Sequence, residues 1–241
     1  HTRLVSDWSS DVCSSDLILD NTPPSIFTLG EVRSKEGNEK NGYWNSTNRE
    51  VSITIPVEND TTLNDGSFQV QVKFQENYQD IGNLISINQN SLGRDTLVII
   101  NGELFLNHQD FEENTNVVFR VKVWDKAGND NYSNESNDSL YIDTSKIIVT
   151  NLHVESNNPD STLAKVGDSL FISFEVNEMI DSLRIQVFEN ECLYQNENSQ
   201  WNSSYEFQDL DPDGDVDFNI YLEDVAGNIN PVLTETQDSS S

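Results

Sequence analysis

Cysteine, methionine, histidine and basic residues are all scarce in this sequence. Its 241 residues include two Cys, one Met and three His, and 13 Lys plus Arg stand against 42 Asp plus Glu. Two cysteines cannot build the disulfide framework of a small secreted animal module. The formal net charge of −29 repels nucleic acid and anionic membranes. We therefore expect no nucleic-acid partner, and the acidity fits either a cation-rich extracellular setting or plain solubility.

Long apolar runs and catalytic motifs are also missing. No run approaches the roughly 18 apolar residues of a membrane span, so we expect no membrane insertion in this segment. The sequence contains no nucleophile elbow, zinc-type histidine spacing or phosphate-binding loop. Two of the three histidines, His108 and His153, are expected in a loop and on a solvent-facing strand position. These absences predict a protein that is not an enzyme.

The first 17 residues differ from the rest of the chain. Asp7–Leu17 reads DWSSDVCSSDL, which resembles the translation of a sequencing-adaptor oligonucleotide. It has no period of 2 or 3.6 and lacks the regions of a signal peptide. The sequence begins with His1 and not with Met, so we expect a fragment and exclude residues 1–17, with Cys13, from both folded modules. The remaining Cys192 is expected to be an unreactive strand or loop residue.

An internal repeat organises the remaining chain. Residues 109–129 read QDFEENTNVVFRVKVWDKAGN and residues 208–228 read QDLDPDGDVDFNIYLEDVAGN, without a gap. Each copy alternates apolar and other residues, and this period of two predicts a strand with one buried face. Both copies end in Asp-x-Ala-Gly-Asn, which predicts a tight turn at Gly128 and Gly227. The predicted buried positions are Val117, Phe119, Val121 and Val123, and Val216, Phe218, Ile220 and Leu222.

Short apolar segments separated by turn residues predict an all-β fold of two tandem immunoglobulin-like β-sandwiches, with a barrel or jelly roll as the alternative. No helix is predicted. Residues 81–93 are expected to form a long loop or extra edge strands. The predicted strands are 26–32, 51–56, 68–75, 97–100, 117–124 and 139–142 in the first module, and 147–154, 169–176, 183–188, 201–207, 217–222 and 231–234 in the second.

Two similar junctions suggest the module boundaries. Leu19-Asp20 and Ile142-Asp143 each end an apolar segment with Asp before a short connector. We expect one module at 18–143, opening with a linker at 18–24, and a second at 144–234. Residues 235–241 are then a tail or a linker to a next module. Because Pro23-Pro24 favours a stiff extended backbone, the linker is expected to act as a spacer in an array that continues upstream.

Several motifs together resemble bacterial Ig-like repeats of large secreted and surface proteins. They are D-N-T-P-P from Asp20, G-Y-W-N-S-T-N at Gly42–Asn48, D-P-D-G-x-V at Asp211–Val216 and the two D-x-A-G-N ends. The chain departs from antibody-type domains, because it has no Cys–Cys pair between sheets and no tyrosine corner. The resemblance implies an extracellular or cell-surface spacer or adhesin segment.

That resemblance also implies partners. Neighbouring Ig-like modules of the same chain are expected, together with a surface glycan or protein ligand. The alternative function is an accessory, carbohydrate-binding module of a secreted hydrolase. Five aromatic residues fit either a sugar-stacking platform or core and strand-entry positions, with Trp124 expected to face outward beside Lys122. They are Tyr43, Trp44, Trp124, Trp201 and Tyr205.

One acidic stretch resembles the first half of an EF-hand loop. Asp209, Asp211, Asp213 and Asp215 alternate along the chain, and Gly214 takes the sixth position. Such spacing predicts a Ca²⁺ site, because calcium binds hard oxygen ligands. The twelfth position is Ile220 where calcium loops have Glu, so a simple acidic turn is the alternative. Asp125 and Asp143 are predicted as a second possible calcium group at the module junction.

Overall fold

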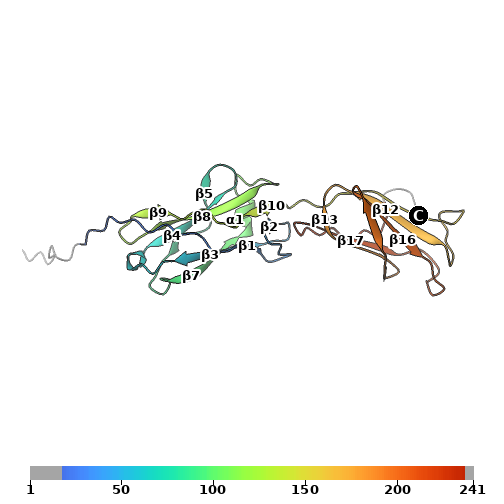
Figure 1. Cartoon of the computed structure of the whole chain (residues 1–241), viewed down its shortest axis with the longest axis horizontal. Helices are drawn as coiled ribbons and strands as arrows, with labels where there is room; N and C mark the ends of the chain where they lie inside the picture. Colours follow the sequence, from blue (N-terminus) through green and yellow to red (C-terminus); the bar gives the residue numbers. More distant parts are fainter. Residues whose placement is uncertain (1–17, 237–241) are drawn as a thin grey trace, which may run out of the picture.

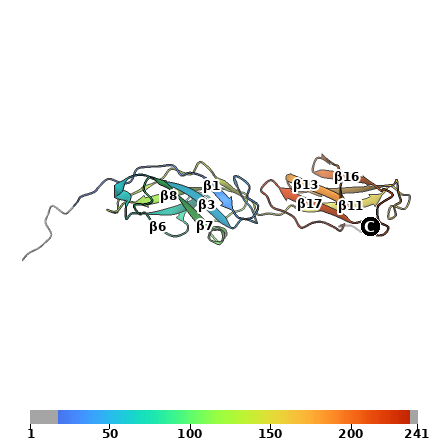
Figure 2. The same cartoon turned by 90° about the horizontal axis from the view of Figure 1, so that it is seen from below.

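The computed structural model describes residues 18–236, which form two β-sandwiches joined end to end along one axis (Figure 1). The same elongated arrangement is seen in the perpendicular view (Figure 2). The prediction of an all-β chain with two tandem immunoglobulin-like sandwiches is confirmed. Residues 1–17, and the expectation about them, lie outside the described part of the chain.

The first sandwich consists of a three-stranded and a seven-stranded sheet. The smaller sheet has the order β1 (Val32–Lys35), β3 (Glu50–Val57), β7 (Arg94–Asn101). The main path of the larger sheet is β2 (Tyr43–Trp44), β10 (Leu140–Ile142), β8 (Asn116–Trp124), β4 (Ser67–Lys73), β5 (Tyr78–Asp80). Two short strands extend it, β6 (Ile85–Ser86) on β4 and β9 (Asp130–Tyr132) on β8.

The second sandwich repeats this plan with fewer strands. One sheet has the order β11 (Val149–Ser156), β12 (Ser169–Val176), β16 (Gln200–Glu206), β15 (Tyr194–Glu197). The other has the order β14 (Asn190–Glu191), β13 (Ile180–Val187), β17 (Phe218–Asp224). Strand β17 therefore pairs with β13 as β8 pairs with β4 in the first sandwich.

Each sandwich has its own apolar core, and the alternating pattern of the repeat accounts for it. Val121 and Val123 of β8 are 0% and 3% exposed, and Ile220 and Leu222 of β17 are 0% and 1% exposed. The two sets lie in separate clusters of buried residues, one from the first sandwich and one from the second. The predicted burial of these four residues is confirmed, as is that of Val117, Phe119 and Phe218, whereas Val216 is only partly buried and lies before β17.

Three local predictions need correction: the absence of helices, the strand at 26–32, and the strand at 231–234, where only Leu233 forms an isolated bridge, with Ile220. A short helix, α1 (Gly102–Leu106), was not predicted; the Asn101 side chain caps it by accepting from the backbone N–H of Glu103. The predicted strand at 26–32 is extended backbone, and pairing starts only at Val32, where β1 begins. Residues 81–93 combine both expected alternatives, because β6 pairs with β4 inside an otherwise irregular loop. A one-turn 3₁₀ helix, η1 (Thr61–Leu63), also precedes β4.

Candidate functional site: the junction between the sandwiches

The second sandwich offers a rigid turn to the first. Asp224 ends β17, and its carboxylate accepts from the backbone N–H of Asn228 at 2.8 Å and from the Asn228 side chain at 2.9 Å. Gly227 takes a φ of 92°, a conformation that glycine adopts without steric cost. Asp224 and Asn228 are fully buried, so the Asp-x-Ala-Gly-Asn end of the repeat forms a closed, hydrogen-bonded turn.

The 38–46 loop of the first sandwich, which is interrupted by the two-residue strand β2, lies on this turn. The Asn45 side chain donates to the Ala226 carbonyl at 2.7 Å, and the Asn38 side chain donates to the Gly227 carbonyl at 2.9 Å. In return, the Asn228 side chain accepts from the backbone N–H of Ser46 at 2.8 Å. Asn45 is itself fully buried. The Asn45 bond is buried and the other two are partly buried, so opening the junction exposes polar groups that must be resolvated.

The two surfaces approach too closely for a side chain at Gly227. A Cβ atom built there would lie 2.8 Å from Asn45 Nδ2 and 2.9 Å from Asn38 Nδ2. Gly227 is therefore needed twice, for its positive φ and for the contact with the loop.

An ion-pair group borders the hydrogen bonds. Lys40 Nζ lies 2.8 Å from Asp181 and 2.7 Å from Glu223 of the second sandwich. Hydrogen bonds to these carboxylates raise the pKa of Lys40 to about 12. The Lys40 hydrogen bond also lowers the pKa of Glu223. Since all three side chains keep partial solvent contact, each pair contributes at most about 1 kcal/mol.

The connecting chain is fixed at both ends. The backbone N–H of Asp143 donates to the Trp44 carbonyl at 2.9 Å, and the next N–H, of Thr144, donates to Glu113 at 3.0 Å. The Asp143 carbonyl accepts from the Asn228 side chain at 2.9 Å. Asn230 then donates to the Ile147 carbonyl at 2.7 Å. The connector is thus bonded to the first sandwich at Asp143 and Thr144, and to the second at Asp143 and Ile147.

Three carboxylates converge at the same place. Within residues 18–236, Asp143, Glu178 and Asp224 form one group whose ligand oxygens all lie within 4.8 Å of one another. The Glu178 Oε1 atom is buried and has no hydrogen-bond partner there. Burial, followed by the charges of Asp224 and Asp143, raises the pKa of Glu178. A proton or a hard cation at this group would reduce the repulsion between the carboxylates.

Asp125 and Asp143 are predicted to form one group, but the structure does not bring them together. Asp125 follows the last residue of β8, whereas the Ile142 carbonyl accepts from Asn114, just before the first. A nine-residue strand spans about 30 Å, so the two carboxylates lie at opposite ends of the first sandwich. Asp224, the counterpart of Asp125 in the repeat, lies beside Asp143 instead.

The other predicted calcium residues lie at the far end of the second sandwich. Asp209, Asp213 and Asp215 are exposed. Asp211 is already bonded, because it accepts from the Tyr205 hydroxyl at 2.8 Å and from the Gln208 N–H at 2.7 Å. Burial and Asp211 raise the pKa of Tyr205 to about 12. The four carboxylates are not among the convergent acidic groups of the described chain, so calcium binding there stays a prediction.

The aromatic residues do not form one platform. Trp44 is fully buried against Phe105, with ring centres 4.9 Å apart, and half-buried Trp201 stacks on Phe174. Trp124 lies on the outer face of β8, and Lys122 Nζ lies 4.8 Å from its ring centre.

A cation also covers the two tyrosines on that outer face. The Arg120 guanidinium lies 3.8 Å from the ring centre of Tyr78 and 4.1 Å from that of Tyr132. Because cations cover ring faces along this surface, they compete with any sugar that would stack there.

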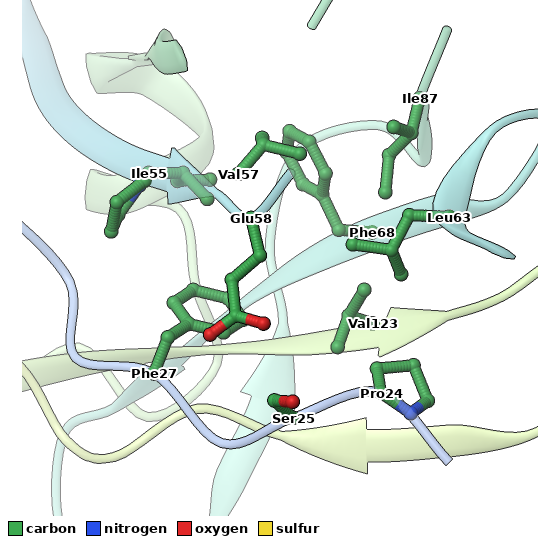
Figure 3. Close-up of a pocket in the computed structure, with 11 residues that line it drawn as sticks. Pro24, Ser25, Phe27, Ile55, Val57, Glu58, Leu63, Phe68, Ile87 and Val123 are labelled. Carbon is green, nitrogen blue, oxygen red and sulfur yellow. The ribbon is translucent and has the colours of Figure 1, made fainter. Parts of the chain in front are cut away.

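Two hollows are described for the chain, and neither is a better candidate site than the junction. Figure 3 shows the first, where Pro24 and Phe27 of the opening segment lie over Val123 and the end of β3. Its volume of about 10 Å³ is near the minimum for a single water molecule. The second, of about 690 Å³, is an open hollow at the far end of the second sandwich, with Asp211, Asp213 and Asp215 in its wall.

The single described cysteine, Cys192, carries no reactive signature. It packs into the second core with 9% exposure, and burial raises its thiol pKa. A raised pKa keeps the thiol protonated and poorly nucleophilic. None of the described helices is long and apolar enough to cross a membrane.

Comparison with known proteins adds little to this picture. No protein-family model matches the chain, and no curated protein matches it. Among solved structures, the chain is similar to the crystal structure of chicken CNTN1 FN1-FN3 domains, with 12% sequence identity and a TM-score of 0.36. The match covers 89% of this chain and spans 65% of that chain. The fold is therefore assigned from the strand order and the two cores alone.

Proposed function

We propose that this chain is a non-catalytic spacer whose task is to hold two Ig-like modules, residues 18–143 and 144–234, in a fixed line. The observation that carries the proposal is the buried hydrogen-bond junction, in which Asn45 and Asn228 reach across between sandwiches. Such a junction supports a role in keeping distance and direction, because each lost buried hydrogen bond costs about 1 kcal/mol or more.

The setting proposed for this spacer is a surface or secreted multidomain protein of bacterial type, as the sequence motifs imply. A strongly acidic chain suits an extracellular stalk, and Cys192, the single cysteine among the described residues, is free and buried. Neighbouring Ig-like modules are its proposed partners. The alternative, a carbohydrate-binding accessory module, is less well supported because Arg120 and Lys122 cover aromatic faces on the first sandwich.

Replacement of Asn228 by Ala tests the spacer proposal. The change removes the bonds to Ser46 and Asp143 that cross the junction, and also the bond to Asp224 inside the turn. We expect a loss of about 2–4 kcal/mol from the second sandwich and junction together. Small-angle X-ray scattering should show a shorter average end-to-end distance, because the two sandwiches then bend relative to each other.

Asn129→Ala is the matched control. Asn129 makes the same bond to its turn, donating to Asp125 at 2.8 Å, but it does not touch the other sandwich. It should cost about 1 kcal/mol and leave the scattering profile unchanged. Equal profiles for the parent chain, Asn228→Ala and Asn129→Ala would contradict the proposal, since the junction bonds would then have no effect on alignment.

A further inference from the structure

The first sandwich carries an unoccupied copy of the junction turn. Asp125 accepts from the backbone N–H groups of Gly128 and Asn129 at 2.8 and 2.9 Å and from the Asn129 side chain. Gly128 has a φ of 94°, against 92° at Gly227. The two turns therefore share their backbone conformation and the two bonds that the Asn backbone and side chain donate to the Asp carboxylate.

The opening segment is fixed against this turn as the connector is fixed in the second sandwich. Asn129 donates to the Asp20 carbonyl at 3.2 Å, and Asn131 donates to the Pro24 carbonyl at 2.8 Å. The corresponding bonds at the junction run from Asn228 to Asp143 and from Asn230 to Ile147. Asp20 thus occupies the position of Asp143, with Pro24 held on the sandwich (Figure 3).

The two turns differ in whether another module covers them. Ala226 and Gly227 are buried by the first sandwich, whereas Ala127 and Gly128 are exposed. A Cβ atom at Gly128 would meet no atom of the described chain within 4 Å. The side-chain amide oxygen of Asn129 is the counterpart of the Asn228 oxygen that accepts from Ser46, and it has no such donor among residues 18–236. The turn has the shape that accepts a module, but no module covers it.

From this difference we infer that the Asp125–Asn129 turn is an acceptor surface for the 38–46 loop of another Ig-like module of this type, joined through Asp20. The inference rests on the proposed spacer function and extends it to the other end of the chain. The turn would be recognised through its backbone carbonyls, which would accept hydrogen bonds from an Asn of the other module at the position of Asn45. One part of the junction has no counterpart, because Trp124 stands where Glu223 pairs with Lys40. Docking at this end should therefore depend less on salt.

The test is an extended chain in which residues 1–19 are replaced by a second copy of residues 20–142, so that the copy runs directly into Asp20. Hydrogen–deuterium exchange is then measured at residues 225–228 and at residues 126–129 of the original first sandwich, which follows the inserted copy. We expect exchange at 126–129 to slow by about tenfold or more relative to the parent chain. Ala127→Arg in the extended chain should abolish the slowing, because the new side chain occupies the docking surface.

The controls separate this inference from the spacer function. In the parent chain, Ala127→Arg should leave thermal unfolding unchanged, while Ala226→Arg should speed exchange at 225–228. Gly128→Ala in the extended chain provides a second, smaller obstacle to docking. Protection at 225–228 without any gain at 126–129 would overturn the inference and leave the spacer proposal intact. An absence of junction protection at 225–228 in the parent chain would overturn both.

Discussion

The two Asp-x-Ala-Gly-Asn turns have the same conformation and different surroundings. Asp125 and Asp224 cap their turns with the same bonds, yet the first turn is exposed and the second is covered by residues 38–46 of the other sandwich. The turn conformation is therefore set locally, by the Asp and Gly of the motif. Contact between modules is set by what the neighbouring loop presents, and this is the part that varies along the chain.

The largest expected effect compares the two cores. Val121→Asp places an unpaired charge among fully buried residues and should cost more than about 4 kcal/mol, enough to unfold the first sandwich. Ile220→Asp should do the same to the second. Exchange measured by mass spectrometry should show the damage confined mainly to the mutated sandwich. Complete loss of both in either variant would mean that the cores are not independent.

A matched glycine pair isolates the contact between modules. Gly128→Ala and Gly227→Ala carry the same strain of about 1 kcal/mol from a positive φ. Only the second adds an overlap with Asn45 and Asn38, worth a further 1–3 kcal/mol or so. Denaturant unfolding should therefore rank Gly227→Ala as the more damaging. Equal losses would show that the loop does not press on the turn in solution.

The internal repeat alone predicts much of this arrangement, but it does not predict contacts between residues that are far apart in the sequence. Alternation predicted the inward residues of β8 and β17, and the motif predicted both turns. Asp143 was predicted to belong to the junction, but its assigned partner was Asp125. Its actual neighbours, Glu178 and Asp224, are distant in sequence and come together only when the second sandwich folds.

Other junction residues gave no local signal. Asn38, Lys40 and Asn45 lie in a loop whose composition resembles any polar turn. The equivalence of Asp20 and Asp143, each followed by a short connector, was the observation that could have placed the preceding residues against the next turn. Helix α1 was missed for a related reason, since five residues are too few for a helical period to show.

A smaller effect is expected from the ion pairs. Lys40→Met should cost about 0.5–1 kcal/mol at low salt and less at high salt. Lys126→Met is the control, because its exposed pair with Asp65 lies away from the junction. Thermal unfolding of both variants should be measured at 10 mM and at 1 M salt, where the screening length is about 30 Å and about 3 Å, respectively. Equal salt dependence in the two variants would show that the Lys40 ion pairs do not stabilise the junction.

The pH dependence of this group has a definite sign. The pKa of Lys40 rises from 10.5 to about 12 on folding, so its stabilisation is complete below pH 10.5 and is lost as the pH rises through 12. The pKa of Glu223 falls from 4.5, so its stabilisation is present above pH 4.5 and is lost as the pH falls through the lowered value. Lys40→Met should remove the first dependence from the unfolding midpoint and reduce the second, because Asn38 still donates to Glu223.

The smallest effect concerns Glu178. Because its pKa in the folded protein is raised above 4.5, the ionised group destabilises the fold at neutral pH and the penalty disappears as the pH falls through the raised value. Glu178→Gln should therefore stabilise the chain at pH 7 by less than about 1 kcal/mol and change nothing near pH 4. Thermal unfolding at both pH values measures this difference, and a destabilisation at pH 7 would contradict it.

Calcium provides a second use of the same variant. If the carboxylates of Asp143, Glu178 and Asp224 bind Ca²⁺, millimolar calcium should raise the unfolding midpoint of the parent chain by mass action. Glu178→Gln should then reduce that response. The double change Asp211→Asn and Asp213→Asn tests the other predicted site. A response lost only in the double variant assigns calcium to the far end of the second sandwich, and no response in the parent chain removes calcium from both sites.

The most direct test of the central claim is the alignment of the two sandwiches in solution. Residual dipolar couplings of backbone amides should be measured for the parent chain and fitted separately for residues 32–142 and 149–224. A rigid junction predicts one alignment tensor, equal in size and direction for both sandwiches, and two unequal tensors in Asn228→Ala. Two unequal tensors in the parent chain would contradict the account, because the buried bonds of Asn45 and Asn228 would then fail to fix the line between modules.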